Sequence, residues 1–140
     1  MSSELKILLV DDDKIMLFLH EMFLKKTGVL CETVLCYNGQ EALDFLDTQQ
    51  STQTTFLVLL DINMPVMNGW EFLSSIRDRP HLPPVHIVMV SSATEQSERE
   101  RAFSFTHVID YQAKPLTIDS CKKIIGAEQV RGFFDDIVFD

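Results

Sequence analysis

The stretch FLVLLD at residues 56–61 decides the fold class of this chain. Five consecutive apolar residues end at a carboxylate, and an unbroken apolar run of this length is typical of an interior strand buried on both faces. An all-helical alternative would need helices of four to six residues, which are too short to be stable. A second run, ILLV at 7–10, ends in three aspartates. The two runs therefore predict interior strands of a parallel sheet that carry acidic side chains at their ends.

Outward from these runs, apolar segments alternate with segments of helical spacing. We predict strands at 7–10, 31–37, 56–60, 85–90 and 108–113, and helices at about 14–26, 39–47, 69–78, 94–101 and 115–125. Ile15, Phe18, Leu19 and Met22 share one face of the first helix, and Asp13 is its expected N-cap. Asn38, with Glu41 three residues later, resembles a capping box that opens the second helix. The alternation predicts an α/β fold with a five-stranded parallel sheet and helices on both faces.

Composition narrows the function classes. The 140 residues are 46% hydrophobic and 24% charged, which indicates one globular domain and excludes disordered and fibrous classes. Twelve basic against 21 acidic residues give a net charge of −9, which argues against nucleic acid as a partner. The three cysteines form no CxxC pair, so we expect free thiols in a reducing compartment rather than a disulfide or zinc site. With no apolar segment long enough for a signal peptide or a membrane span, we expect a cytoplasmic protein without a membrane partner.

Polar side chains gather where the predicted strands end. Asp11, Asp12 and Asp13 follow the first strand and Asp61 the third, whereas Ser91-Ser92 follow the fourth and Lys114-Pro115 the fifth. Because the carboxyl ends of parallel strands meet at one edge of a sheet, we expect these acids, a hydroxyl and an ammonium to form a single site.

Four motifs fall in order on these strand ends: ILLVDDD at 7–13, LLDINMPVMNG at 59–69, VSS at 90–92 and DYQAKP at 110–115. Together they resemble the receiver domain of two-component response regulators, over about residues 5–125. The resemblance implies a flavodoxin-like, doubly wound sheet with strand order 2-1-3-4-5. It also implies roles, which are an acidic pair (Asp11, Asp12), a phosphoacceptor (Asp61), a switch hydroxyl (Ser91), an aromatic switch (Tyr111) and a signature lysine (Lys114).

The chemistry of these residue types agrees with those roles. A carboxylate can attack phosphorus and form an acyl phosphate. Carboxylates crowded together repel, and a hard divalent cation relieves that repulsion, so oxygen ligands favour Mg²⁺ over zinc. We expect Asp12 and Asp61 to be direct ligands and Asp11 a direct or outer ligand, and the resemblance adds the backbone carbonyl of Asn63. Lys114 and the Ser91 hydroxyl are expected to stabilise the phosphoryl oxygens.

The resemblance also implies partners. The phosphoryl group is expected from a phosphohistidine on a sensor histidine kinase or a histidine phosphotransfer protein. The expected response is an inward turn of Tyr111 that alters the face formed by the fourth helix and the fifth strand. That face would bind a downstream protein target, and a homodimer on phosphorylation is a further expectation.

Several alternatives stay open. Ser92 competes with Ser91 as the switch hydroxyl, and the family's usual Gly-Ala before the aromatic is replaced by His107-Val108. A receiver-like interaction module that takes no phosphate is the second functional hypothesis. A Mg²⁺-dependent phosphatase is the third, although Asn63 stands where such enzymes place a general acid.

The predicted division of the chain is a receiver domain at 1–127 and an extension at 128–140. The extension is too short for an output domain. Its aromatic and acidic residues are expected either to pack back on the domain or to serve as a docking segment.

Overall fold

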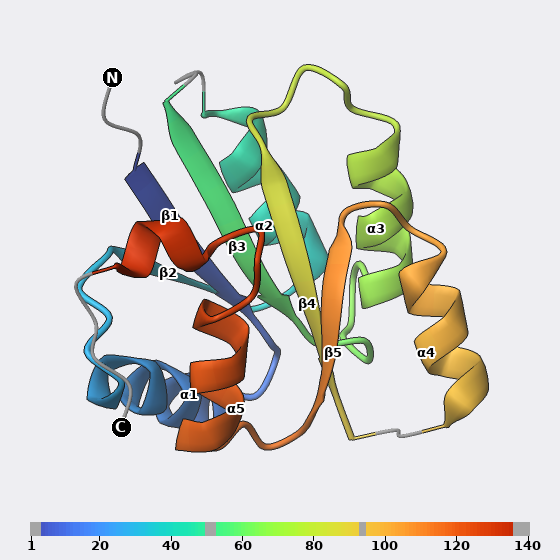
Figure 1. Ribbon diagram of the computed structural model, residues 1–140. Coiled ribbons are helices and arrows are strands. Elements are labelled where there is room, and N and C mark those ends of the chain that lie inside the picture. The colour runs from blue at the N-terminus through green and yellow to red at the C-terminus, as the bar shows by residue number, and fades with distance from the viewer. Residues whose placement is uncertain (1–3, 50–52, 93–94, 136–140) are drawn as a thin grey trace.

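A computed structural model describes residues 4–49, 53–92 and 95–135 of the chain. Its centre is a parallel sheet of β1 (Glu4–Val10), β2 (Thr33–Cys36), β3 (Thr54–Leu60), β4 (Val85–Ser91) and β5 (Val108–Ala113). The strands lie in the order β2-β1-β3-β4-β5 (Figure 1). This confirms the predicted doubly wound, flavodoxin-like fold and its strand order.

Helices cover both faces of the sheet. They are α1 (Lys14–Lys26), α2 (Gly39–Asp47), α3 (Gly69–Arg77), α4 (Gln96–Phe103) and α5 (Ile118–Ile125), followed by a 3-10 turn at Arg131–Phe134. Buried side chains of α2, α3 and α4 share one hydrophobic cluster, and those of α1, α5 and the final turn share the other. The chain thus forms three layers, with the sheet in the middle.

The alternation of β3 explains the unbroken apolar run that predicted it. Phe56, Val58 and Leu60 belong to the cluster under α2–α4, whereas Leu57 and Leu59 belong to the cluster under α1 and α5. Successive side chains of a strand point to opposite faces, and here both faces are covered. From Phe56 to Leu60, where both faces are buried, the strand therefore has no polar position.

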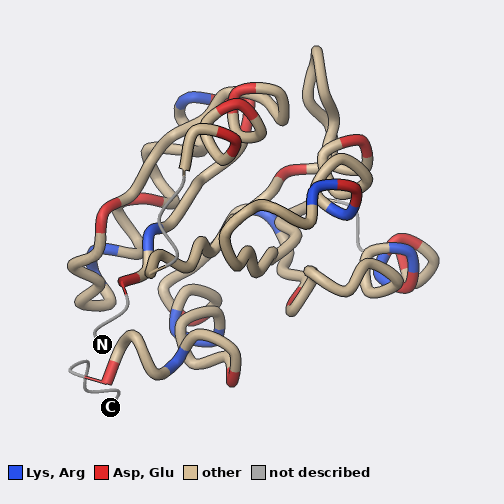
Figure 2. The backbone as a smooth tube through the Cα atoms, turned by 90° about the horizontal axis from the view of Figure 1, so that it is seen from above, with Lys and Arg blue, Asp and Glu red and all other residues tan. Residues whose placement is uncertain are grey.

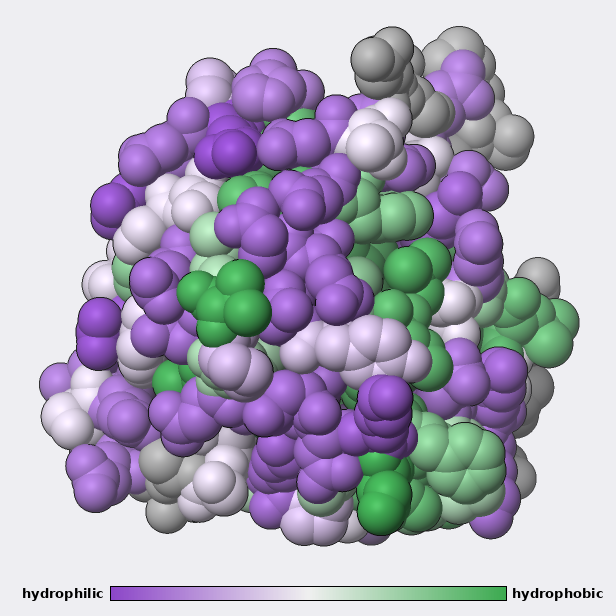
Figure 3. Space-filling model, turned by 180° about the vertical axis from the view of Figure 1, so that it is seen from behind, coloured by the Kyte–Doolittle hydropathy of each residue, from purple (hydrophilic) through white to green (hydrophobic). Residues whose placement is uncertain are grey.

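The apolar stripe of α1 noted in the sequence is not the one that packs on the sheet. Ile15 and Phe18 are 73% and 63% exposed, and the buried side chains of the helix are Leu17, His20 and Leu24. The helix rests on the sheet through this second stripe, so Ile15 and Phe18 face outward, whereas Leu19 and Met22 are half-buried. Hydrophobic side chains gather accordingly at the lower right of the surface in Figure 3, where α1 lies.

Other boundaries moved by a few residues. β2 is limited to Thr33–Cys36, within the predicted 31–37. α4 begins at Gln96, whereas the predicted start, residue 94, lies outside the described residues. In the pairing of β4 with β5, Ile87 lies opposite Val108 and Val88 opposite Asp110, so one extra residue bulges between them. This bulge lies next to the His107-Val108 departure from the family pattern.

Side-chain caps fix the starts of the helices that follow the site loops. Asp13 accepts hydrogen bonds from the backbone N–H groups of Ile15 and Met16, as predicted. Asn38 accepts from the N–H of Glu41, but Glu41 accepts from Tyr37 instead of completing the expected box. Complete boxes are formed by Asn68 and Glu71 at α3 and by Thr117 and Ser120 at α5, and neither was predicted from the sequence.

The residues after α5 pack back on the domain. Val130 and Phe134 are buried in the cluster under α1 and α5. This agrees with the packing alternative for the described part of the extension, and residues 136–140 lie outside that part. Among the described helices, none has the length and apolarity needed to cross a membrane.

Candidate functional site

Three carboxylates meet at the carboxyl edge of the sheet. Asp11 and Asp12 follow β1, Asp61 follows β3, and the last residues of these neighbouring strands, Val10 and Leu60, pair in register. One carboxylate oxygen from each of the three acids lies within 4.8 Å of the others. Asp11 and Asp61 are buried and Asp12 is exposed, so the cluster is open to solvent on one side. The strand order reverses between β1 and β3, which is where sites form in such sheets.

Lys114 supplies the balancing positive charge from the end of β5. Its Nζ lies 2.7 Å from Oδ2 of Asp11 and 3.5 Å from Oδ2 of Asp61. Burial opposes the charge on this ammonium, yet the hydrogen bond to Asp11 and the charges of Asp61 and Asp11 raise its pKa above the ordinary value. Lys114 is therefore a fixed cation in the site.

Asp61 is the acid of the cluster whose ionised form is disfavoured. Burial and the charge of Asp11 raise its pKa to about 6, against the smaller opposing effects of Lys114 and the Ile62 N–H. That N–H donates to Oδ1 of Asp61 at 2.8 Å, and the Asp61 N–H donates to the carbonyl of Val10 at 3.0 Å. One lysine thus leaves the negative charge of this carboxylate incompletely compensated.

The loop after β3 holds Asp61 through its backbone. Gly69 donates to the carbonyl of Ile62 at 2.8 Å, and a Cβ on Gly69 would lie 2.7 Å from the carbonyl oxygen of Asp61. Val66 has a φ of 70°, which is strained for a β-branched residue. The glycine of the LLDINMPVMNG motif is needed because the turn passes directly against the backbone of Asp61.

Ser91 and Tyr111 meet beside the cluster. Ser91 is the last residue of β4 and is 1% exposed, whereas Ser92 is exposed. A hydrogen bond joins the side chains of Ser91 and Tyr111, and the Tyr111 hydroxyl lies 3.5 Å from Oε2 of Glu98. Burial raises the pKa of Tyr111, and the bond with Ser91 opposes that rise. The aromatic ring is therefore buried against Ser91 and α4, and its role as a switch stays a prediction.

Helix α4 contacts this aromatic residue through an arginine. A guanidinium N–H of Arg99 donates to the Tyr111 carbonyl at 3.3 Å, and the guanidinium lies 5.2 Å from the centre of the Tyr111 ring. Acidic and basic positions alternate around α4, at the right of Figure 2. The charged stretch of α4 thus contacts Tyr111 through Arg99, in addition to forming a charged helix surface.

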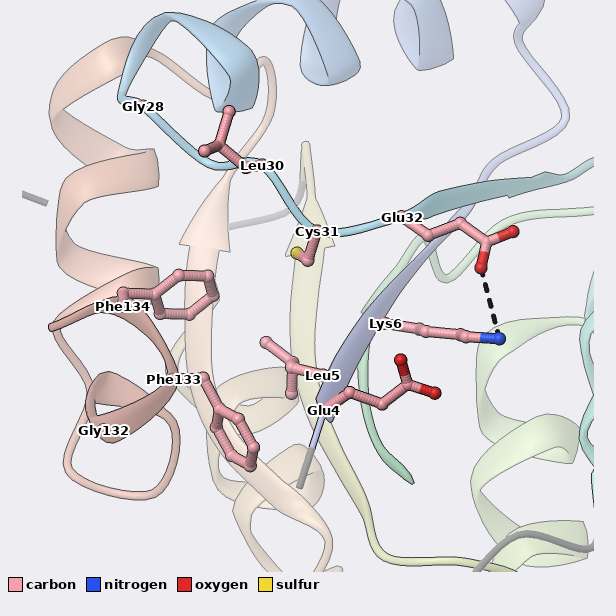
Figure 4. A pocket seen from close by; sticks show the side chains of 10 residues that line it. All are labelled: Glu4, Leu5, Lys6, Gly28, Leu30, Cys31, Glu32, Gly132, Phe133 and Phe134. Atoms are coloured by element: carbon pink, nitrogen blue, oxygen red, sulfur yellow. Dashed lines mark ion pairs between the residues drawn. The ribbon is translucent and has the colours of Figure 1, made fainter. Parts of the chain in front are cut away.

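A separate hollow lies at the opposite, amino-terminal edge of the sheet (Figure 4). Its lining comes from the start of β1, the α1–β2 connection and the 3-10 turn, including Leu5, Cys31, Phe133 and Phe134. Lys6 and Glu32 form an ion pair of 3.2 Å at its rim. Because its charged side chains are paired or at the rim, this hollow offers no counterpart to the acidic cluster.

The structure brings together most residues singled out from the sequence. Asp11, Asp12, Asp61 and Lys114 form one cluster, and Ser91 and Tyr111 form a hydrogen-bonded pair. Asn63 is exposed two residues after Asp61, and its carbonyl as a metal ligand stays a prediction. The sequence reading missed His20, whose Nε2 accepts from the Leu116 N–H at 3.1 Å. A histidine among the apolar positions of a helix carried no signal of that contact.

Comparison with known proteins agrees with the geometry. The chain is 38% identical over 112 residues to a protein-glutamate methylesterase/protein-glutamine glutaminase of Geobacillus kaustophilus, covering 79% of this chain and 30% of that protein. It is 28% identical to a probable methanogenesis regulatory protein, FilR2, of Methanothrix harundinacea, covering 91% and 82% of the two chains. A crystal structure of a response regulator receiver protein from Dyadobacter fermentans superimposes with a TM-score of 0.73 at 27% identity, covering 86% and 94%.

The pattern that describes the response regulator receiver domain matches residues 7–126, which include every strand end discussed above. The chain therefore belongs to the receiver domain family of two-component response regulators.

Proposed function

We propose that this receiver domain is a phosphoacceptor switch in which Asp61 takes a phosphoryl group from a phosphohistidine in the presence of Mg²⁺. The observation that carries the proposal is the position of Asp61, a buried carboxylate of raised pKa beside two further acids and a lysine. In the transfer, an oxygen of Asp61 forms the new bond to phosphorus as the bond from phosphorus to the histidine nitrogen breaks. The donor histidine leaves with the electron pair of that bond.

The acidic cluster suits a magnesium ion. Its donors are all carboxylate oxygens, which hard cations prefer. Burial and, after it, the charge of Asp11 raise the pKa of Asp61, so a cation beside this carboxylate would stabilise its ionised form. Asp12 and Asp61 would hold the ion, with Asp11 as a direct or outer ligand and the Asn63 carbonyl as a further ligand. When bound, the ion would neutralise charge on the acids and on the transferred group.

The remaining side chains would stabilise the phosphoryl oxygens. Lys114 carries a permanent charge within reach of Asp61. Ser91 would donate its hydroxyl, which requires its bond with Tyr111 to rearrange. A change in that bond would pass to Glu98 and Arg99 on α4, which both contact Tyr111. We propose that this face of α4 and β5 binds the downstream target.

The exposed stripe of α1 supports a protein as the phosphodonor. Ile15 and Phe18 lie on the first two turns after the acidic residues, and both are mostly exposed. Exposed apolar patches of this kind mark protein-binding surfaces. A sensor histidine kinase or phosphotransfer protein could cover this stripe while its phosphohistidine reaches Asp61.

Intact-mass spectrometry after incubation with acetyl phosphate and Mg²⁺ tests the proposal. We expect one phosphoryl group on the wild type, none on Asp61→Asn, and none when EDTA replaces Mg²⁺. Trp70, the first helical residue after Gly69, should report beryllofluoride binding by a change in fluorescence. An unmodified wild type with no Mg²⁺-dependent change would favour the second candidate, a receiver-like interaction module that takes no phosphate. The intact acidic cluster argues against that candidate.

Several predictions go beyond these observations. They are the domain limits 1–127 and 128–140, a cytoplasmic location, slow self-dephosphorylation and dimerisation on phosphorylation. Each stays a prediction.

A further inference from the structure

The segment that carries Lys114 into α5 is fixed at both ends. The Lys114 N–H donates to the carbonyl of Ser91 at 2.9 Å, and Thr117 caps α5 by accepting from the Ser120 N–H at 3.0 Å. Pro115 has no N–H, so the amide of Leu116 is the one backbone donor between these ends. Leu116 is fully buried, and water cannot satisfy this donor.

His20 satisfies that donor from α1. Its imidazole is 4% exposed, and Nε2 accepts from the Leu116 N–H at 3.1 Å. The same helix is capped by Asp13, the residue directly after the acidic pair. His20 therefore ties the strand end that carries the lysine to the helix that begins at the acids.

The imidazole is neutral at physiological pH. Burial and the charge of Lys114 lower the pKa of His20 to about 4, against the opposing charge of Asp13. A neutral ring that accepts at Nε2 carries its proton on Nδ1, and an imidazolium could not accept at all. The bond to Leu116 is thus intact under the conditions of phosphoryl transfer.

The geometry points to His20 as a positioning residue for Lys114 in phosphorylation of Asp61. This inference rests on the proposed function. The Lys114 ammonium reaches the acids across a four-carbon chain, so the position of its backbone sets the range within which the charge can act. Nζ lies between Asp11 and Asp61 at 2.7 and 3.5 Å, and a small displacement of the segment would move it from the phosphoryl position. Misplacement of about 1 Å can slow a reaction by up to about 100-fold.

The rate of phosphorylation by acetyl phosphate with Mg²⁺, followed by intact mass, tests the inference. His20→Leu removes the acceptor, and we expect a roughly 10-fold slower rate. His20→Gln places an amide oxygen near the position of Nε2 and should restore the rate to within about 3-fold of the wild type. Leu24→Ala is the matched control because it weakens the buried face of α1 without touching the bond to Leu116. Measured well below its melting temperature, this control should react at the wild-type rate.

A double-mutant cycle separates positioning from general loosening. If His20 acts through Lys114, then His20→Leu should slow the Lys114→Ala protein by less than about 2-fold. A His20→Leu rate equal to the wild type would overturn the inference. So would an undiminished loss in the Lys114→Ala background, or an equal loss in Leu24→Ala. A wild type that takes no phosphoryl group would instead overturn the proposed function, and this inference with it.

Discussion

Replacing Asp61 with asparagine should stabilise the metal-free protein, although it removes a residue of the site. The pKa of this buried carboxyl is raised from 3.8 to about 6, first by burial and then by the charge of Asp11. A raised folded-state pKa means that the folded protein binds more protons than the unfolded chain between pH 4 and 6. Stability from this group is therefore present at low pH and is lost as the pH rises through about 6.

The size of the effect follows from the shift. Two pKa units correspond to about 3 kcal/mol of unfolding free energy, which the ionised carboxylate costs the folded state at pH 7.5. Asparagine has the shape of the protonated acid and cannot ionise. Asp61→Asn should thus raise the free energy of unfolding by up to about 3 kcal/mol, or the melting temperature by roughly 10 °C.

Thermal denaturation in EDTA at several pH values provides the assay. The advantage of Asp61→Asn should be full at pH 7.5, shrink below pH 6 and vanish near pH 4. Added Mg²⁺ should stabilise the wild type more than the variant and so reduce the difference. Glu128→Gln, which removes one exposed negative charge elsewhere, should change the melting temperature little. A variant no more stable than the wild type at pH 7.5 would refute the reasoning, as would an advantage independent of pH.

Three further changes test other parts of the structure. Gly69→Ala should lower the free energy of unfolding by about 1–3 kcal/mol and slow phosphorylation, because its Cβ would meet the Asp61 carbonyl oxygen at 2.7 Å; Gly132→Ala, with nothing within 4 Å, should do neither. His20→Leu should remove about 3 kcal/mol of the pH dependence of the free energy of unfolding. Because the folded-state pKa of His20 is lowered from 6.5 to about 4, the stability it contributes above pH 6.5 is lost as the pH falls toward 4. An unchanged pH profile of the unfolding free energy would contradict this. Arg101→Gln removes a guanidinium 4.1 Å from the centre of the single indole ring, and a denaturant titration should show a loss of about 0.5–1 kcal/mol.

The fold was predictable because two independent patterns agree. Runs such as FLVLL at 56–60 have no polar position, as expected for a strand that is covered on both faces. The acids, the hydroxyl and the lysine follow successive runs, so a parallel sheet brings them to one edge whatever the details of the loops. The cluster of Asp11, Asp12 and Asp61 needed no more than this.

The features that the sequence did not predict depend on packing between distant elements. Ile15, Phe18 and Met22 have the spacing of a buried stripe, yet Leu17, His20 and Leu24 face the sheet. The sequence offers two apolar stripes on α1 and no local signal that ranks them.

The roles of His20 and Arg99 were hidden for a similar reason. Each is defined by a backbone group far along the chain, the Leu116 N–H and the Tyr111 carbonyl. Local spacing says nothing about such contacts. The contacts of the Tyr111 side chain likewise involve Ser91 and Glu98, which lie on other elements.

The most direct test of the central claim is to identify the residue that carries the phosphoryl group. Treatment of the phosphorylated protein with borohydride reduces an aspartyl phosphate to homoserine, and peptide mass spectrometry then locates it. The account predicts homoserine at position 61 alone, formed only when Mg²⁺ was present during phosphorylation. Homoserine at 11 or 12, or none at any position in a protein fully exposed to donor and Mg²⁺, would contradict it.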